Sequence, residues 1–148
     1  MAETAFDRLR VFRGAAQQPP AVPGSTEQGR AMFGEFVVSW EAARAPEALE
    51  RAGWTTWIGP AGWEVRSYQT GDRLVPLGGV GHRPVRRLLM EAQVPRGERS
   101  RYPVIARGET ILWIPGICRS AADLPSPGTP AVRLDVTECR EPEANRRA

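Results

Sequence analysis

Apolar and polar residues alternate along several short stretches of the chain, and this period of two predicts β-strands. Turn-forming Gly, Pro, Asn, Asp and Ser residues separate most of these stretches. The predicted strands cover residues 32–40, 54–58, 63–68, 102–106, 109–114 and 132–136. Short strands at close spacing favour antiparallel pairing over a parallel sheet, which needs long crossovers.

Two pairs of these strands are predicted to form β-hairpins. Residues 54–58 and 63–68 flank the sequence GPAG at 59–62, which is a strong turn signal. Residues 102–106 and 109–114 flank Arg107-Gly108. We expect the apolar run at 111–114 to lie in the core.

A period of 3.6 residues appears once, over residues 83–93. Val85, Leu88, Leu89 and Ala92 recur at helical spacing and predict a buried stripe, with Pro84 in the first turn. A further helical turn is expected at residues 47–51. Together these elements predict the α+β class: a small mixed domain of β-hairpins or antiparallel sheet with one or two short helices.

Three arginines, Arg83, Arg86 and Arg87, share another face of the predicted helix, near its N-terminus. Cations are unfavourable at that end of the helix dipole unless an anion compensates them. The cluster therefore favours an anionic ligand. The alternative is a solvated surface whose arginines pair with acids elsewhere in the fold.

The predicted organisation has three parts. Residues 1–29 form a leader strand and a flexible linker rich in Pro and Gly. Residues 30–140 form the domain, and residues 141–148 form a loose tail. The chain shows neither an apolar run of membrane-spanning length nor a secretory signal pattern, so we expect a cytoplasmic protein.

The residue inventory excludes several kinds of chemistry. All 20 basic residues are arginine, so no lysine is present to form a Schiff base or to complete a Walker phosphate loop. His82 is the only histidine, and Cys118 and Cys139 lack a zinc spacing. We expect two buried or inert thiols and no metal. The Gly-rich loop at 74–82 is only a weak phosphate signal, and no nucleophile–base pair stands out.

Charge is distributed unevenly. Residues 66–107 hold nine arginines and three acids, a net charge of +6, while the whole chain carries +3. A basic block inside an acidic frame is typical of a protein that binds a polyanion. Charge alone does not distinguish such a protein from one with a solvated basic face.

Five tryptophans offer rings that could stack on bases. Most of them lie in apolar strand patterns, so we expect them in the core, with Trp57 the weakest case. The tryptophans are Trp40, Trp54, Trp57, Trp63 and Trp113.

Several blocks of sequence occur in an order and spacing that resemble the C-terminal domain of bacterial tRNA(Ile)-lysidine synthetase, TilS. The blocks are GDRLVPLG at 71–78, the Arg-rich helix, VPRGER at 94–99, YPVI at 102–105 and ILWIPG at 111–116. They cover about 55 residues tightly, and agreement over several blocks is more specific than one short motif.

The resemblance implies a small mixed α/β domain that contacts tRNA around the acceptor stem. Carried over by position, the tRNA-contacting residues are Arg66, Arg73, Arg83, Arg86, Arg87, Arg96 and Arg99. Gly71 and Asp72 are expected to form a structural turn. The carboxylate of Asp72 would accept backbone N–H bonds or pair with an arginine.

The family's catalysis belongs to an N-terminal PP-loop ATPase domain, whose phosphate loop this sequence does not show. The resemblance therefore implies a tRNA-binding module that is not catalytic alone and has no cofactor of its own. ATP and magnesium would enter only through a catalytic partner. The expected partners are isoleucine tRNA with a CAU anticodon and a PP-loop ATPase, with no membrane and no DNA. The alternatives are a domain that binds a separately encoded protein, and a decayed fragment.

Overall fold

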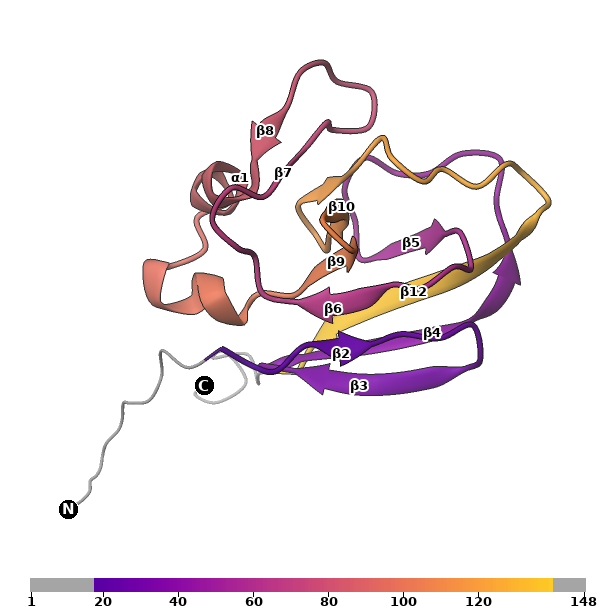
Figure 1. Ribbon diagram of the computed structural model, residues 1–148, viewed down its shortest axis with the longest axis horizontal. Helices are drawn as coiled ribbons and strands as arrows, with labels where there is room; N and C mark the ends of the chain where they lie inside the picture. The colour runs from indigo at the N-terminus through magenta and orange to yellow at the C-terminus, as the bar shows by residue number, and fades with distance from the viewer. Residues whose placement is uncertain (1–17, 140–148) are drawn as a thin grey trace, which may run out of the picture.

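The computed structural model describes residues 18–139 and consists mainly of antiparallel β-sheet with two short helices. Two sheets face each other, and a smaller unit of helix and short strands covers one of them (Figure 1). The α+β prediction is confirmed. The leader strand, expected at residues 7–13 within the segment 1–29, and the tail at 141–148 lie outside the described residues.

One sheet has four strands in the order β3-β4-β12-β5. Its strands are β3 (Gly29–Phe33), β4 (Phe36–Arg44), β12 (Pro130–Glu138) and β5 (Thr55–Ile58). The central pair is long, with Pro130 opposite Arg44 and Glu138 opposite Phe36. The predicted strand at 132–136 is confirmed as part of β12, whereas the single strand predicted at 32–40 is a hairpin that turns at Gly34 and Glu35.

The other large sheet has five strands in the order β11-β10-β9-β6-β2. Its strands are β11 (Cys118–Arg119), β10 (Thr110–Ile114), β9 (Val104–Arg107), β6 (Glu64–Arg66) and β2 (Val22–Pro23). The hairpin predicted around Arg107-Gly108 is confirmed as β9 and β10.

The hairpin predicted around residues 59–62 is wrong. The two strands exist, but β5 pairs with β12 in the four-stranded sheet, while β6 pairs with β9 and β2 in the other. The turn carries the chain from one sheet to the facing one. Ile58 and Trp63, on either side of it, both enter the core between the sheets.

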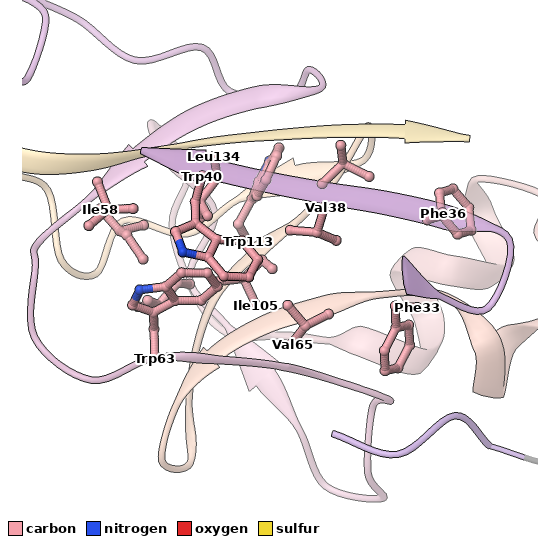
Figure 2. Packing of buried hydrophobic residues seen from close by; sticks show 13 residues of the cluster. Phe33, Phe36, Val38, Trp40, Ile58, Trp63, Val65, Ile105, Trp113 and Leu134 are labelled. Atoms are coloured by element: carbon pink, nitrogen blue, oxygen red, sulfur yellow. The ribbon is translucent and has the colours of Figure 1, made fainter. Parts of the chain in front are cut away.

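The main core fills the space between the two sheets. Trp40 and Trp63 meet edge to face there, with ring centroids 5.1 Å apart and an interplanar angle of 88°. Figure 2 shows these rings beside Trp113, with Val38 and Leu134 from one sheet and Val65 and Ile105 from the other. Burial of such large apolar side chains is the main source of stability.

The predicted linker packs against this core from Val22 onward. Trp40 donates its indole N–H to the Ser25 hydroxyl (3.3 Å), and Trp63 donates to the Ser25 carbonyl (3.1 Å). A Cβ at Gly24 would lie 2.1 Å from the Trp63 ring, and one at Gly29 would lie 2.5 Å from Trp40. The glycines therefore permit close packing, and the prediction of a flexible linker is wrong for residues 22–29.

A second core lies on the outer face of the five-stranded sheet. Val104 and Ala106 of β9 point into it, while Ile105 between them points into the main core. The outer layer consists of β7 (Arg73–Leu74), β8 (Arg83–Pro84), α1 (Val85–Glu91) and the 3-10 helix η1 (Arg96–Arg101). We call this layer the arginine cap. The helical turn expected at 47–51 is absent, since these described residues form bends and irregular loop.

Candidate functional site

Apolar side chains anchor the arginine cap to the sheet. Leu74, Val85, Leu88 and Leu89 are buried in the second core, which leaves the other face of α1 to solvent. The helix begins after Pro84, whose φ of −65° and ψ of 136° lie outside the helical region. Arg83 therefore belongs to β8 and does not share the helix face with Arg86 and Arg87, as the spacing had predicted.

Helix α1 ends two residues earlier than predicted. Gln93 adopts φ +65°, its N–H bonds the Met90 carbonyl, and Val94 N–H bonds the Leu89 carbonyl. These two backbone hydrogen bonds form a Schellman motif, in which glycine usually occupies the position of Gln93. The motif turns the chain into η1, so it sets where Arg96 and Arg99 lie.

Four cap arginines are exposed: Arg73, Arg86, Arg87 and Arg96. Within residues 18–139, no carboxylate forms an ion pair with any of them. In the described part of the chain, the one side-chain hydrogen bond of this group joins Arg86 Nη1 to the Met90 sulfur at 3.8 Å. Four guanidinium groups thus face water on one small unit, and this arrangement attracts anions.

Two further arginines of the predicted set are partly engaged. Arg83 Nη2 lies 2.7 Å from the Glu91 carboxylate in an exposed ion pair. Arg99 donates its Nε–H to the Val94 carbonyl at 3.0 Å, which braces the start of η1. Both residues are half-buried. Each keeps guanidinium donors beyond the contact described.

Arg66 occupies a different environment, since only 6% of it is exposed. Its Nη1 lies 2.8 Å from Asp72 Oδ2 and its Nη2 lies 3.3 Å from Asp72 Oδ1. Asp72 also accepts the backbone N–H of Gln69 at 2.7 Å, and Gly71 has φ +94° in the same turn. Arg66 and Asp72 therefore hold the turn that leads into β7, and Arg66 does not reach the outer surface with the cap arginines.

His82, in the Gly-rich loop between β7 and β8, is exposed.

The tryptophans follow the prediction that they lie in the core only in part. Trp40, Trp63 and Trp113 are buried as predicted, and Trp57 is half-buried. The core prediction is wrong for Trp54, which is 45% exposed and stacks on Phe36 at a centroid distance of 6.3 Å. Trp54 lies immediately before β5.

Sequence analysis missed a buried arginine, Arg119, which is 0% exposed. Its Nε donates to the Thr56 hydroxyl, and its two terminal nitrogens donate to five backbone carbonyls at 2.8–3.0 Å. Burial lowers the pKa of Arg119 to about 10, partly opposed by Asp123. The carbonyls belong to Trp57, Leu112, Ser120, Ala122 and Asp123.

Arg107 likewise donates hydrogen bonds to backbone carbonyls and, like Arg119, interacts with Asp123. Its Nη1 lies 2.7 Å from Asp123 Oδ2, and its other nitrogens donate to the carbonyls of Gly59, Ala61 and Gly62. It thereby fixes the turn that crosses between the sheets. We call Arg107 and Arg119 with their partners the buried-arginine corner. No short motif in the sequence signals it, because its partners are mainly backbone carbonyls.

The described residues offer no grouping suited to a metal ion, since no three His, Cys, Asp or Glu side chains converge there. Cys118 is buried, and burial raises the pKa of its thiol. Cys139 is exposed, so only one of the two thiols is buried. No helix among residues 18–139 is long and apolar enough to cross a membrane.

Comparisons with known proteins all point to one family. Residues 63–136 match the family described as the TilS substrate C-terminal domain. A tRNA(Ile)-lysidine synthase of Symbiobacterium thermophilum is 35% identical over 136 residues, covering 86% of this chain and 27% of that protein. One from Geobacter sulfurreducens is 37% identical over 62 residues, covering 42% of this chain and 13% of that protein. The chain thus spans about a quarter or less of the length of these relatives.

A solved structure has a similar fold. The crystal structure of a TilS C-terminal domain superposes with a TM-score of 0.67 at 22% sequence identity. The similarity covers 82% of this chain and all of that one. At this identity the match establishes the fold of the domain.

Proposed function

Because this chain belongs to the family of TilS substrate C-terminal domains, we propose that its arginine cap binds the tRNA substrate of a tRNA(Ile)-lysidine synthase. The observation that carries the proposal is the set of four exposed arginines without a carboxylate partner in the described residues. Phosphates are the groups that such side chains bind best, since guanidinium donors form paired hydrogen bonds with their oxygens.

The proposed binding is to backbone and shape. The major groove of A-form RNA is too narrow for side chains to enter, so a rigid basic surface meets phosphates and 2′-hydroxyls instead. The cap suits this role because its framework is anchored by buried Leu74, Val85 and Leu89. The proposed contacts are Arg73, Arg86, Arg87 and Arg96. Arg83 and Arg99, which are partly engaged within the fold, are proposed as weaker contacts. Arg66 is not included, because it is buried and paired with Asp72.

Residues 63–136 match the TilS substrate C-terminal domain and the chain covers 27% of its Symbiobacterium relative, so the chemistry proposed for it is substrate binding. In this proposal, ATP, magnesium and the modification of isoleucine tRNA with a CAU anticodon belong to the catalytic part of the enzyme. The cap would meet the tRNA away from the anticodon, around the acceptor stem. Because the proposed substrate is tRNA, we also propose that the protein lies in the cytoplasm.

A pair of variants tests the proposal. Arg86→Glu combined with Arg87→Glu reverses two exposed charges on α1, whereas Arg44→Glu reverses an exposed charge on β4. Affinity for isoleucine tRNA with a CAU anticodon is measured by fluorescence anisotropy at low salt. We expect the double variant to bind about 100-fold more weakly and Arg44→Glu to change affinity by about twofold or less.

An unchanged affinity in the double variant would contradict the proposal. A second tRNA in the same assay separates recognition of one tRNA from general RNA binding. If the chain binds neither tRNA but retains a PP-loop protein in RNase-treated lysate, the alternative of a protein-binding domain is supported instead.

A further inference from the structure

A depression of about 390 Å³ lies beside the start of β7, between the turn at residues 68–73 and the beginning of α1. This volume is near the lower end of the range seen for small-ligand sites. Its lining includes Tyr68, Gln69, Thr70, Gly71, Arg73 and Arg86. We propose that this depression is a specific phosphate-binding site. The proposal rests on the proposed function, because the phosphate it would take belongs to RNA.

The lining is rich in hydrogen-bond donors. Five of the residues that line it carry hydrogen-bond donors in their side chains: Tyr68, Gln69, Thr70, Arg73 and Arg86. Among residues 18–139, the side chains of Tyr68, Gln69, Thr70 and Arg73 have no recorded hydrogen bond or ion pair. A phosphodiester carries only acceptor oxygens at its periphery, so it matches a wall of unused donors better than a neutral ligand does.

The one acid in the lining does not oppose an anion. Asp72 accepts hydrogen bonds from Arg66 Nη1 and Nη2 and from the Gln69 backbone. Its charge is thus compensated by Arg66, which is buried beneath the turn. Arg73 and Arg86 therefore leave the depression with an uncompensated positive charge. Field lines from such charges are focused in a concave site bounded by protein.

The shape of the site distinguishes it from the rest of the cap. Arg87 and Arg96 are exposed but do not line this depression, so they meet an anion from one side only. At the depression, hydroxyl and amide donors surround the anion together with the arginines. This arrangement predicts that a neutral substitution such as Thr70→Val weakens binding, although it leaves the charge of the protein unchanged.

Two sources of phosphate fit this chemistry. One is a phosphodiester of the RNA backbone, and the other is a terminal 5′-phosphate, whose three free oxygens can each accept a bond. Hairpin RNAs of one sequence, with either a 5′-phosphate or a 5′-hydroxyl, distinguish them. A preference for the phosphorylated RNA that disappears in Arg73→Gln identifies the terminal group. Equal binding of both RNAs, weakened in Arg73→Gln, identifies the backbone.

The site itself is tested with inorganic phosphate. In ¹H–¹⁵N spectra of the full chain, we expect saturable shifts of the backbone amides at residues 69–73. These shifts should require about tenfold more phosphate in Arg73→Gln and about threefold more in Thr70→Val. Arg96→Gln, a matched change elsewhere on the cap, should leave them unchanged.

The outcomes separate this proposal from the proposed function. If phosphate does not shift the 69–73 amides, or shifts them equally in Arg73→Gln, the site is disproved even when RNA binds elsewhere on the cap. If the amides shift as expected but no RNA binds, the phosphate site stands and the tRNA proposal fails.

Discussion

Arg119 and Arg86 have the same side chain, yet the first is fully buried and the second is exposed. In the buried-arginine corner, every donor of Arg119 points toward an oxygen of the fold. In the arginine cap, Arg86 has no carboxylate partner within the described residues. The comparison shows that the fold has satisfied one group of arginines and has left the other available for an external anion.

The difference arises from the elements that carry each group. The corner lies where residues 56–57 meet the distant segment 112–123, so backbone carbonyls surround the guanidinium. The cap is a single outer layer on one sheet, and its buried stripe leaves the opposite side of a seven-residue helix in water. Substitutions in the corner should therefore change stability, and substitutions in the cap should change binding.

The largest effect is expected from Arg119→Met. This change leaves five carbonyls and a hydroxyl without their buried donor, and we expect a loss of about 3–5 kcal/mol in the free energy of unfolding. Urea denaturation followed by circular dichroism measures it. Arg133→Met, on β12, removes solvent-accessible ion pairs with Glu41 and Asp135; it is the control and should cost about 1 kcal/mol or less. A loss below about 1 kcal/mol for Arg119→Met would remove the distinction between corner and cap.

Tyr102 connects the main core with the second core beneath the arginine cap, because its side chain packs against both. Its hydroxyl donates to the Pro115 carbonyl at 2.6 Å, and burial raises the pKa of Tyr102 to about 12, with a smaller contribution from Glu138. The unfolded phenol ionises near pH 10. The contribution of the protonated Tyr102 phenol to the free energy of unfolding is therefore complete below about pH 10 and is lost as the pH rises toward about 12.

Tyr102→Phe should remove this pH dependence. Between about pH 10 and about pH 12, we expect the wild type to lose about 1–2 kcal/mol more of its unfolding free energy than the variant does. At neutral pH the variant should be less stable by about 1 kcal/mol, because the Pro115 carbonyl loses its donor. Parallel stability curves for the two proteins above pH 10 would show that the phenol is as solvated in the folded chain as in the unfolded one.

The smallest expected effect comes from Glu91→Gln, which removes the carboxylate paired with Arg83. The pair is exposed, so stability should change by about 0.5 kcal/mol or less. Release of Arg83 should raise tRNA affinity by about twofold at low salt, because another cation becomes available for phosphate. Glu109→Gln, on the exposed turn before β10, gives the same change in net charge away from the cap. Equal gains for the two variants would mean that only net charge matters.

The sequence predicted the elements whose signals are local. The β9–β10 hairpin turns at Arg107-Gly108, and both the strands and their pairing follow from adjacent residues. The apolar stripe of α1 was predicted correctly at Val85, Leu88 and Leu89 but wrongly at Ala92, which is exposed just past the end of the helix. The turn at 59–62 was also visible. Whether its two strands pair with each other depends on β12 and β9, which lie far along the chain.

The candidate site was predictable in composition but not in arrangement. Arg66 and Arg73 are similar in sequence terms, since each lies in a predicted strand or turn beside polar residues. Only the fold shows that Asp72 pairs with Arg66 and leaves Arg73 exposed. In the same way, the sequence gives no sign that Gly24 and Gly29 lie against tryptophan rings. Long-range contacts decide these cases, and periodicity does not report them.

The central claim is that the cap arginines contact tRNA phosphates, and the salt dependence of binding tests it most directly. Each phosphate contact contributes about −0.9 to the slope of log affinity against log salt concentration. We predict that Arg86→Gln combined with Arg87→Gln makes the slope shallower by about 2, while Arg44→Gln leaves it unchanged. Identical slopes for the wild type and the double variant would show that these arginines do not contact the RNA backbone.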